Sequence, residues 1–363
     1  MSYTNGLDKP SDYFNTVLYT GNGGGTRSIT GTGFQPDLVW NKDRSDPVGY
    51  PHFVFDAVRG AGVEKEIITN STNAEGAYDL DNYGYISSFD SDGFTTTIGA
   101  VNNGYFNNSG TNYVSWHWLA NGAGSSNTDG SITSTVSANT TSGFSIATYA
   151  GNSTAGATIG HGLNAVPSMV IVKSTSNAES WAVYHKDVTT ANNYYLYLNT
   201  TGGLVTTGGD RWSVGSNSST LFGLGNDGTT NSSGQNYVAY CFAEKKGFSK
   251  FGSYVGNASA TDNAFIYCGF KPAFFLSKCS SISGDRWTLY DNKRDPYNSV
   301  YRRLFPDGNI AESGNVDADI DFTSTGVKIR TDAGTSGAAQ TYIYMAFAEH
   351  PLVSSTGTPV TAR

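Results

Sequence analysis

Apolar and polar positions alternate, or form short apolar runs, in segments spread along the whole chain. Gly, Asn, Asp and Ser bound most of these segments, as in VLYTGN (17–22) and HFVFD (52–56). This pattern is typical of β-strands separated by tight turns. No long stretch shows helical periodicity with capping residues, and SDYFNTVLY and AVRGAGVEKEI offer a turn or two at most. The pattern therefore predicts an all-β protein.

Three segments of the chain share one frame. Each opens on Tyr-x-Gly-Asn, reaches a proline followed six residues later by a lysine, passes an aromatic strand and closes on a strongly apolar strand. The landmarks are the opening tyrosines Tyr19, Tyr149 and Tyr254, the lysines Lys42, Lys173 and Lys278, and the closing tyrosines Tyr113, Tyr237 and Tyr342. The opening tyrosines lie 130 and 105 residues apart, and the closing ones 124 and 105. Because two independent landmarks give nearly the same offsets, the repeat indicates three related structural units.

The length of one unit matches that of a two-sheet antiparallel sandwich. We therefore predict an all-β chain of three tandem antiparallel β-sandwich domains, of jelly-roll or lectin-like type, related by the internal repeat. The closing strand is apolar on both faces, which predicts a central position in its sheet, beside the strand that ends at the lysine. The predicted organisation is an N-terminal docking segment 1–16, sandwiches 17–122, 144–246 and 247–355, a linker or edge strand 123–143, and a tail 356–363.

The glycine-rich stretch YTGNGGGTRSITGTGFQP (19–36) invites comparison with a phosphate-binding loop. Such loops combine a defined glycine spacing, usually a lysine, and a following helix whose N-terminus faces the anion. Here no lysine follows, the next element is a predicted strand, and the glycine run is missing from the corresponding stretches of the other two units. We therefore expect a turn, with Gly23–Gly25 particular to the first unit.

Composition and charge narrow the class of partners. Charged residues are 14% of the chain and its formal net charge is -8, with Lys245–Lys246 and Arg302–Arg303 as the tight basic pairs. Nucleic-acid binding is not expected, because it requires Lys and Arg gathered on one face. No apolar run approaches the ~20 residues that span a bilayer, so membrane insertion is not expected either. Cys241, Cys268 and Cys279 lack metal-site spacing, and the N-terminus lacks the features of a secretion signal, so we expect synthesis in a cytoplasm without disulfides and a buried Cys241.

Signals for a metal site are weak. Asp90 and Asp92 have calcium-loop spacing, but Val101 stands where an EF-hand loop needs a glutamate. A tight turn between two strands is the favoured interpretation, and a calcium site built with Asp79 or Asp81 is the alternative. No cofactor is predicted.

Signals for catalysis are equally weak, and no catalytic residue is predicted. The histidines are scattered without metal-site pairing, and His117, between Trp116 and Trp118, is expected to face the opposite side of its strand. They are His52, His117, His161, His185 and His350. Paired carboxylates for glycoside hydrolysis stay open, because that chemistry needs only two acids a short distance apart. The candidate acids are Asp56, Glu64, Glu66, Asp291 and Asp295.

Aromatic residues outside the common frame are the candidate ligand-binding residues. Exposed Tyr and Trp side chains stack on sugar rings and anchor protein interfaces. The candidates are Tyr194, Tyr195, Trp212, Tyr297 and Tyr301. The alternative is that these side chains fill the sandwich cores.

The first unit carries DKPSDYFNTVLYTGN, GFQPDLVW, FDAVRG and FDSDGF, and closes on NYVSWHW. In these motifs it resembles virion structural or tail-fibre-like proteins encoded by marine bacteriophages. The resemblance covers the first unit closely and the others through the repeat frame, because they carry WAVYHKDV and WTLYDNKRD in place of the FDAVRG pattern. It implies a particle component without established catalytic residues, assembled in the host cytoplasm, with other virion proteins as partners and a homo-oligomer, such as a trimer, as its state.

We therefore expect a non-enzymatic bacteriophage virion structural protein, located in the virion. The expected form is an exposed appendage, a tail fibre or head fibre, with adhesion to a host-surface glycan. A capsid decoration or cement protein is the alternative within the same class. A polysaccharide depolymerase is the alternative from another class.

Overall fold

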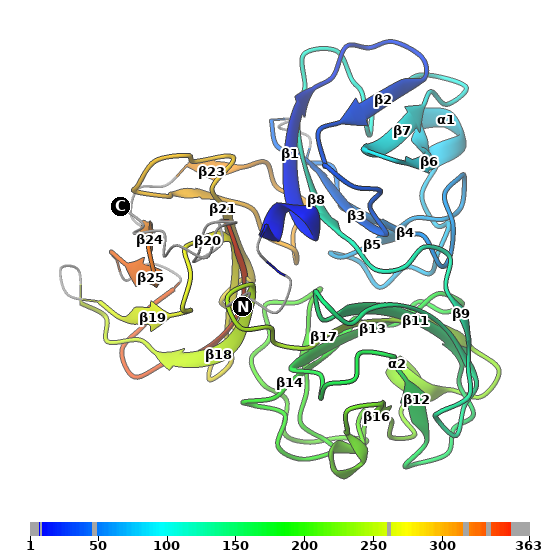
Figure 1. Cartoon of the computed structure of the whole chain (residues 1–363), viewed down its shortest axis with the longest axis vertical. Coiled ribbons are helices and arrows are strands. Elements are labelled where there is room, and N and C mark those ends of the chain that lie inside the picture. The colour runs from blue at the N-terminus through cyan, green and yellow to red at the C-terminus, as the bar shows by residue number, and fades with distance from the viewer. Residues whose placement is uncertain are drawn as a thin grey trace.

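The computed structural model describes residue 7 and residues 9–45, 49–259, 263–314, 319–331 and 335–349. Antiparallel strands dominate these residues, which confirms the all-β prediction. The helical elements among them are single turns: η1 (Pro10–Asp12), α1 (Leu80–Tyr83), η2 (Val214–Ser216) and α2 (Gly228–Asn231). Figure 1 shows three lobes around a common centre, here called lobe 1 (residues 9–120), lobe 2 (121–244) and lobe 3 (245–349).

Each lobe contains one large sheet, its main sheet. The main sheet of lobe 1 has the order β1 (Phe14–Thr20), β8 (Asn112–Trp118), β3 (Leu38–Asp43), β4 (His52–Asp56), β5 (Ile67–Ile68). That of lobe 2 is β15 (Leu196–Tyr197), β14 (Ala182–His185), β13 (Met169–Ser174), β17 (Asn236–Phe242), β11 (Phe144–Ala150), β10 (Ser134–Asn139), β9 (Ser125–Asn127). That of lobe 3 is β18 (Ser249–Val255), β26 (Thr341–Ala348), β20 (Pro272–Cys279), β21 (Thr288–Asp291).

The same four strands recur in each main sheet in the same order: opening, closing, lysine-bearing and aromatic. The closing strand lies between the opening and the lysine-bearing strands in every lobe, which confirms the position predicted for it. In each lobe the opening and closing tyrosines are cross-strand partners, and this pairing explains why the spacing of the landmark tyrosines repeats. Their rings stack at centroid distances of 4.9 Å (Tyr19 and Tyr113), 5.3 Å (Tyr149 and Tyr237) and 5.1 Å (Tyr254 and Tyr342).

Small sheets complete the lobes. Lobe 1 has the order β2 (Arg27–Thr30), β7 (Gly93–Thr97), β6 (Tyr85–Asp90), and lobe 2 pairs β12 (Thr158–Gly160) with β16 (Leu221–Gly223). Lobe 3 has the order β19 (Phe265–Tyr267), β25 (Gly326–Ile329), β24 (Ile320–Thr323), and a separate pair, β22 (Arg302–Arg303) with β23 (Ser313–Gly314). Apolar residues of each small sheet share a hydrophobic cluster with residues of the main sheet of the same lobe. Each lobe thus has a core of its own.

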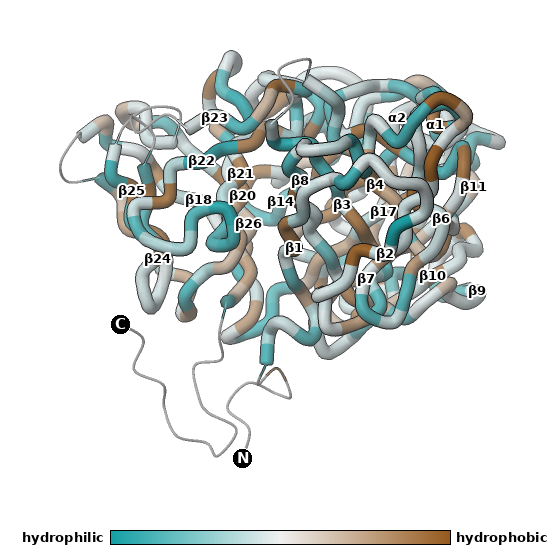
Figure 2. Tube along the Cα trace, turned by 90° about the horizontal axis from the view of Figure 1, so that it is seen from above, coloured by the Kyte–Doolittle hydropathy of each residue, from teal (hydrophilic) through white to brown (hydrophobic). Residues whose placement is uncertain are grey.

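A further hydrophobic cluster joins the three lobes, and we call it the central core. It is formed by the main-sheet faces turned away from the small sheets. At its middle, Trp118, Phe242 and Phe347 hold the same position on the three closing strands. Their ring centroids lie 6.3, 6.2 and 5.7 Å apart, a triangle of equivalent residues. The lobes therefore surround a pseudo-threefold axis, and Figure 2 shows apolar stretches along the main-sheet strands that meet there.

The repeated lysines connect each lobe to a neighbour. All three are fully buried, and each ammonium donates to a backbone carbonyl of another lobe. The donations are Lys42 Nζ to Asn309 O at 3.3 Å, Lys173 Nζ to Thr72 O at 3.2 Å, and Lys278 Nζ to Thr201 O at 3.0 Å. A buried ammonium is tolerated only when its donors are satisfied, and these carbonyls satisfy them across the lobe boundaries. The repeated lysines therefore join the three lobes in a ring.

Backbone hydrogen bonds repeat the same ring. The residue three positions after each accepting carbonyl donates its N–H to the carbonyl two residues after a lysine. These bonds run from Glu75 N to Thr175 O (3.1 Å), Leu204 N to Ser280 O (2.7 Å) and Glu312 N to Arg44 O (2.8 Å). Together with the lysines they give all three lobe boundaries one common geometry.

The segments outside the repeat frame are part of the fold where the structure describes them. Within the predicted linker 123–143, β9 and β10 lie at the edge of the lobe 2 main sheet. Within the predicted docking segment 1–16, Leu7 and Phe14 belong to the central core. Residues 1–6, Asp8 and the tail 356–363 lie outside the described residues.

The glycine of each Tyr-x-Gly-Asn motif has a steric reason. A Cβ on Gly21 would lie 1.9 Å from the backbone oxygen of Asn108, and one on Gly151 or Gly256 would lie 2.4 or 2.5 Å from a backbone oxygen. Gly25, in contrast, has open space around it. The frame glycine is therefore required by packing, whereas Gly25 follows from the local turn alone.

Candidate functional site

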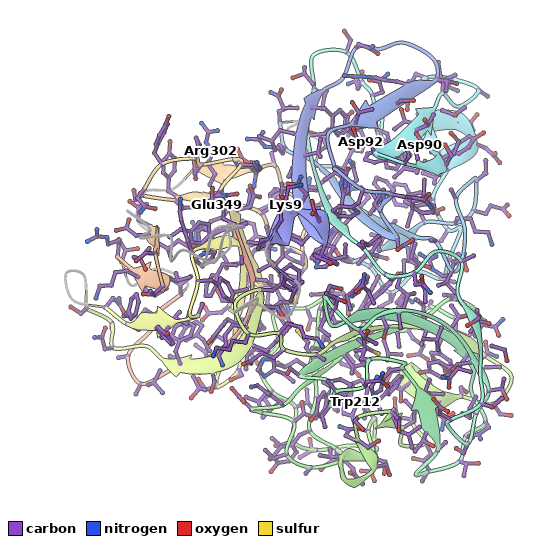
Figure 3. All side chains as sticks on the ribbon, viewed as in Figure 1. Lys9, Asp90, Asp92, Trp212, Arg302 and Glu349 are labelled. Atoms are coloured by element: carbon purple, nitrogen blue, oxygen red, sulfur yellow. The ribbon has the colours of Figure 1, made fainter. Side chains whose placement is uncertain are left out.

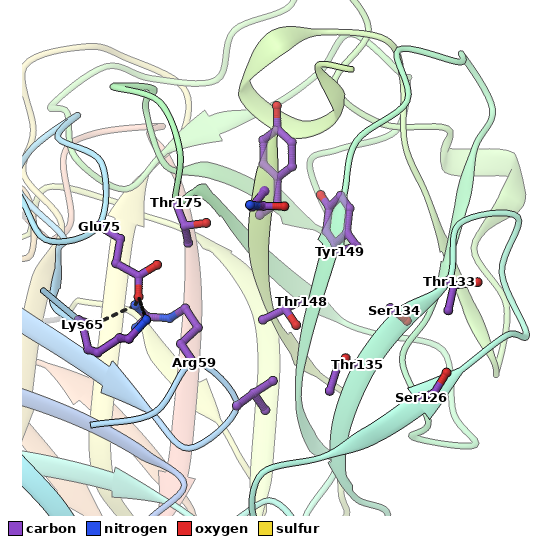
Figure 4. A pocket seen from close by; sticks show the side chains of 13 residues that line it. Arg59, Lys65, Glu75, Ser126, Thr133, Ser134, Thr135, Thr148, Tyr149 and Thr175 are labelled. Carbon is purple, nitrogen blue, oxygen red and sulfur yellow. Dashed lines mark hydrogen bonds and ion pairs between the residues drawn. The ribbon is translucent and has the colours of Figure 1, made fainter. Parts of the chain in front are cut away.

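A groove lies between lobe 1 and the outer strands of the lobe 2 main sheet. Its volume is about 410 Å³. One wall comes from the lobe 1 segment after β4, which carries Arg59, Lys65 and Glu75, and the other wall comes from β9, β10 and β11 (Figure 4). The second wall presents the hydroxyl groups of Ser126, Thr133, Thr135 and Thr148, whereas Ser134 lines the groove without its hydroxyl, which donates to Gly160 O on the other side of the sheet.

The hydroxyl wall follows from the strand pattern. Thr135 and Thr148 are cross-strand partners on β10 and β11, and both are half-buried, so they lie on the groove side of the sheet. Tyr149 points to the other side, where its ring stacks on Tyr237 and its hydroxyl donates to Thr230 O at 2.8 Å. Threonine hydroxyls both donate and accept hydrogen bonds. This wall therefore suits a ligand rich in hydroxyl groups.

The charged wall is held by a buried ion pair. Arg59 Nε lies 2.6 Å from Asp56 Oδ2, and Arg59 Nη1 lies 3.3 Å from Glu75 Oε1. Burial lowers the pKa of Arg59, but the carboxylates of Asp56 and Glu75 outweigh it and the net pKa is raised. The hydroxyl of Tyr240, from lobe 2, donates to the same Asp56 oxygen at 2.8 Å. The guanidinium is thus fixed, and Lys65 is the exposed cation of the groove, 3.5 Å from Glu75.

The expectation of exposed aromatics was wrong for two of the five predicted ligand-binding residues. Tyr195 and Trp212 are buried in the core of lobe 2. Tyr195 is covered by the Arg211 guanidinium, 3.9 Å from the ring centroid, and Trp212 packs edge-on against Tyr184. Figure 3 shows Trp212 inside lobe 2. The core-filling alternative applies to these two residues.

The other three candidates do not gather into one site. Tyr297 is 83% exposed on the segment after β21, and Tyr301 is half-buried in the same lobe. Tyr194 is half-buried in lobe 2. None of the five lines the groove.

The predicted turn at Asp90 and Asp92 is confirmed. Asp90 pairs with Gly93 at the end of the β6–β7 hairpin, which Figure 3 shows in lobe 1. The Asp92 carboxylate accepts the backbone N–H groups of Gly31 (3.1 Å) and Gly33 (2.6 Å), and these bonds lower its pKa. Within the described ranges, no group of three or more His, Cys, Asp or Glu side chains is placed to hold a metal ion.

The candidate acids are spread over two lobes. Asp56 and Asp291 occupy equivalent repeat positions and each is paired with an arginine three residues on. Asp295 accepts the N–H of Tyr301 at 2.9 Å and lies 3.4 Å from Arg302 Nε. Glu66 is buried, which raises its pKa to about 7. Of the carboxylates, only that of Glu75 lines the described groove, so the groove does not present two facing acids.

Histidine and cysteine side chains pack in the interior. His117 lies opposite Trp116 and Trp118, as predicted, with Thr32 Oγ1 and Ser115 Oγ each 2.7 Å from a ring nitrogen, and burial lowers its pKa to about 3. The buried Cys241 thiol is confirmed, and Cys268 and Cys279 are also free and buried. His350 lies outside the described residues. Among the described residues, none of the helices has the length and apolar character that crossing a bilayer requires.

Sequence reasoning missed the groove. Its hydroxyl residues come from a chain in which Ser and Thr are abundant, so no local pattern marks them. The signal that existed was the FDAVRG motif of the first unit, which supplies Asp56 and Arg59. The other groove residues are brought together by the position of β9 and β10 at the end of the lobe 2 main sheet, and this position follows from tertiary pairing.

The fold and groove define a repeat-built, all-β protein with a polar surface groove between two lobes. The family described as a domain of unknown function, DUF7483, matches residues 9–351, and the chain belongs to this family. No curated protein and no solved structure matches the chain.

Proposed function

We propose that this protein is a non-enzymatic structural protein of a bacteriophage particle, an exposed appendage that adheres to a host-surface glycan through the groove. One observation supports the structural role: the three lobes share the central core and are joined at their boundaries by the ring of buried lysines. Such a body is a single rigid unit. Rigidity suits a component that carries load and presents a surface, and the resemblance of the first unit to virion proteins points the same way.

The finer description of the fold belongs to this proposal. We regard each lobe as a β-sandwich domain of jelly-roll or lectin-like type. The support is that a main sheet and a small sheet enclose a hydrophobic cluster in each lobe. Sandwiches of this kind bind ligands on strand faces and connecting segments, and the groove is lined by both.

The groove supports binding to a glycan. Its wall of Ser and Thr hydroxyls matches the donor and acceptor pattern of sugar hydroxyls, and Lys65 adds a cation for acidic sugars. A hydrolase would need a second carboxylate facing Glu75. For this reason we favour adhesion over depolymerisation.

Binding of host-surface polysaccharide to the purified full chain tests adhesion. The double variant Thr135→Val, Thr148→Val removes two groove hydroxyls at nearly constant volume and is expected to weaken binding by about tenfold. The control Thr30→Val changes an exposed strand threonine outside the groove and is expected to bind normally. Equal binding by all three proteins would reject the groove, and turnover of the polysaccharide would favour the depolymerase.

Particle location is tested separately. Immunogold labelling of purified virions is expected to mark an appendage, at a few to a few dozen copies per particle. Hundreds of copies over the capsid would favour the decoration or cement protein. Absence of the protein from purified particles would reject the structural proposal altogether.

A further inference from the structure

The edge strand of the lobe 3 small sheet differs from its counterparts in the other lobes. In all three lobes the first strand of the small sheet carries one buried isoleucine: Ile29 in β2, Ile159 in β12 and Ile266 in β19. The outward positions on either side of it are Ser28 and Thr30 in lobe 1, Thr158 and Gly160 in lobe 2, and Phe265 and Tyr267 in lobe 3. Only lobe 3 therefore places aromatic residues there.

These two aromatic side chains face solvent. Phe265 is 49% and Tyr267 66% exposed, and β19 is the terminal strand of its sheet. Backbone bonds from Ile329 N to Ala264 O and from Cys268 N to Thr325 O fix the ladder with β25. Because antiparallel ladders alternate, the backbone N–H and C=O groups of Phe265 and Tyr267 point away from β25, to the free edge.

Lobe 2 shows what such an edge accepts. The segment 131–132, which leads into β10, lies along the free edge of β12, with Ile132 bridged in parallel to Ile159. Ile132 N donates to Thr158 O at 3.1 Å, and Thr158 N donates to Ser131 Oγ at 2.8 Å. Thr158 is the counterpart of Phe265. Both backbone groups of this position are thus satisfied by an extended, uncharged segment.

Lobe 3 has no such segment of its own among the described residues. The connection that enters lobe 2 runs from β8 to β11 and includes β9 and β10, whereas β17 and β18 are joined by residues 243–248 alone. An exposed strand edge with apolar side chains is a site where further strands pair, unless charge or a covering segment protects it. In lobe 1 the corresponding edge carries the polar Ser28 and Thr30.

We propose that the free edge of β19 binds an extended, uncharged segment of a partner polypeptide, paired parallel to the strand as residues 131–132 pair with β12. Backbone hydrogen bonds to Phe265 and Tyr267 supply the pairing. An aliphatic residue at the position that Ile132 occupies in lobe 2 packs on the inner face beside Ile266, and the two outward rings pack on the partner residues on either side of it. This is strand addition to a sheet edge. The inference does not depend on the glycan groove.

Amide hydrogen exchange of the full chain tests this proposal with a synthetic peptide of residues 128–137 (TDGSITSTVS) as the probe. At a peptide concentration ten times the dissociation constant, exchange at the amides of Phe265 and Tyr267 is expected to slow roughly tenfold. A peptide with Ile132→Pro is expected to have no effect, because proline removes the pairing N–H.

A matched protein variant completes the test. The double variant Phe265→Ser, Tyr267→Thr gives β19 the outward residues of β2 and is expected to lose the slowing while keeping its unfolding midpoint. Equal slowing by both peptides, or none by the first, would overturn the proposal. So would slowing caused by host polysaccharide instead of peptide, or by raising the concentration of the chain alone, since the latter would assign the edge to a second copy.

Discussion

The three lobe boundaries share one backbone geometry and one buried lysine each, but two of them also contain a buried aspartate–arginine network and the third does not. At the boundary of lobes 1 and 2, Asp56 pairs with Arg59, and Tyr240 donates to the aspartate from across the boundary. At the boundary of lobes 3 and 1, Asp291 pairs with Arg294 at 2.5 Å, and Trp116 Nε1 donates to Asp291 at 3.1 Å. Two boundaries thus use the same charged network.

The boundary of lobes 2 and 3 replaces every member of that network. His185 stands at the aspartate position, Val188 at the arginine position, and Leu204 where Glu75 and Glu312 stand. Met345 takes the place of Tyr240 and Trp116 on the closing strand. The His185 Nδ1 still accepts a backbone N–H two residues on, from Asp187, as the Asp56 carboxylate does from Val58.

All the charged members of the network are therefore present together or absent together. A buried charge left without its partner is costly, whereas exchanging the whole group for apolar residues of similar volume is often neutral. A chain that lost only the arginine would bury an unpaired aspartate. The lysine ring is common to all three boundaries, so it is the part of the geometry that does not depend on this exchange.

Breaking one charged boundary is the change with the largest expected effect. Arg294→Met leaves Asp291 buried without its cation, while Glu312 keeps its pair with Arg44, and the change is expected to lower the free energy of unfolding by about 3–5 kcal/mol. Denaturant unfolding followed by tryptophan fluorescence measures this loss.

The matched control imports the lobe 2 set. Arg44, which pairs with Glu312, has Ser280 as its counterpart at the boundary of lobes 2 and 3. Asp291→His, Arg294→Val, Glu312→Leu and Arg44→Ser together with Trp116→Met are therefore expected to recover most of the stability that Arg294→Met loses. A combined variant that is no more stable than Arg294→Met would show that the charged network is not exchangeable as a unit.

Removing a lysine of the ring has the next largest expected effect. Lys173→Met leaves the carbonyls of Thr72 and Ser174 without their donor and is expected to cost about 2 kcal/mol. Burial lowers the pKa of Lys173 to about 7. Between this pH and the ordinary lysine pKa the unfolded chain binds the additional proton, so the wild type gains stability as the pH rises from 7 to 10.

The variant lacks this gain. The stability difference between wild type and Lys173→Met is therefore expected to widen over the same pH range, as measured by unfolding at a series of pH values. A difference that stays constant would mean that the ammonium is not desolvated at the lobe boundary.

The histidine of the third boundary gives the smallest expected effect. Burial lowers the pKa of His185 to about 4, below the ordinary histidine value near 6.5. As the pH falls below 6.5 the unfolded chain takes up a proton that the folded chain does not, so stability is lost. His185→Asn keeps an acceptor for the Asp187 N–H without a titrating ring.

This variant is expected to lose about 1 kcal/mol less than the wild type between pH 7.5 and 5.5. Thermal unfolding at the two pH values measures the difference. Identical acid sensitivity in both proteins would contradict the burial of a neutral imidazole at this boundary.

Much of the fold could be predicted from the sequence because the frame residues have local or pairwise causes. The landmark tyrosines stack across neighbouring strands, and the apolar closing strand is central because both of its faces are buried. The arrangement of the lobes could not be predicted in this way. The apolar outer face of each main sheet was consistent with a separate sandwich, and only tertiary packing brings Trp118, Phe242 and Phe347 together.

The candidate site was less predictable than the fold. The aromatic candidates lie outside the repeat frame, but Tyr195 and Trp212 are buried because they fill the core of lobe 2. The groove depends on Thr135 and Thr148 becoming cross-strand neighbours beside a wall from another lobe. No spacing in the sequence encodes this contact.

The claim that three lobes form one cooperative body around the central core has a direct test. Amide hydrogen exchange of the full chain, measured at increasing denaturant, reports the opening of β8, β17 and β26 separately. If the core is shared, the three strands lose protection at the same denaturant concentration. Loss of protection in one closing strand while the other two stay protected would contradict a shared core and show lobes that fold independently.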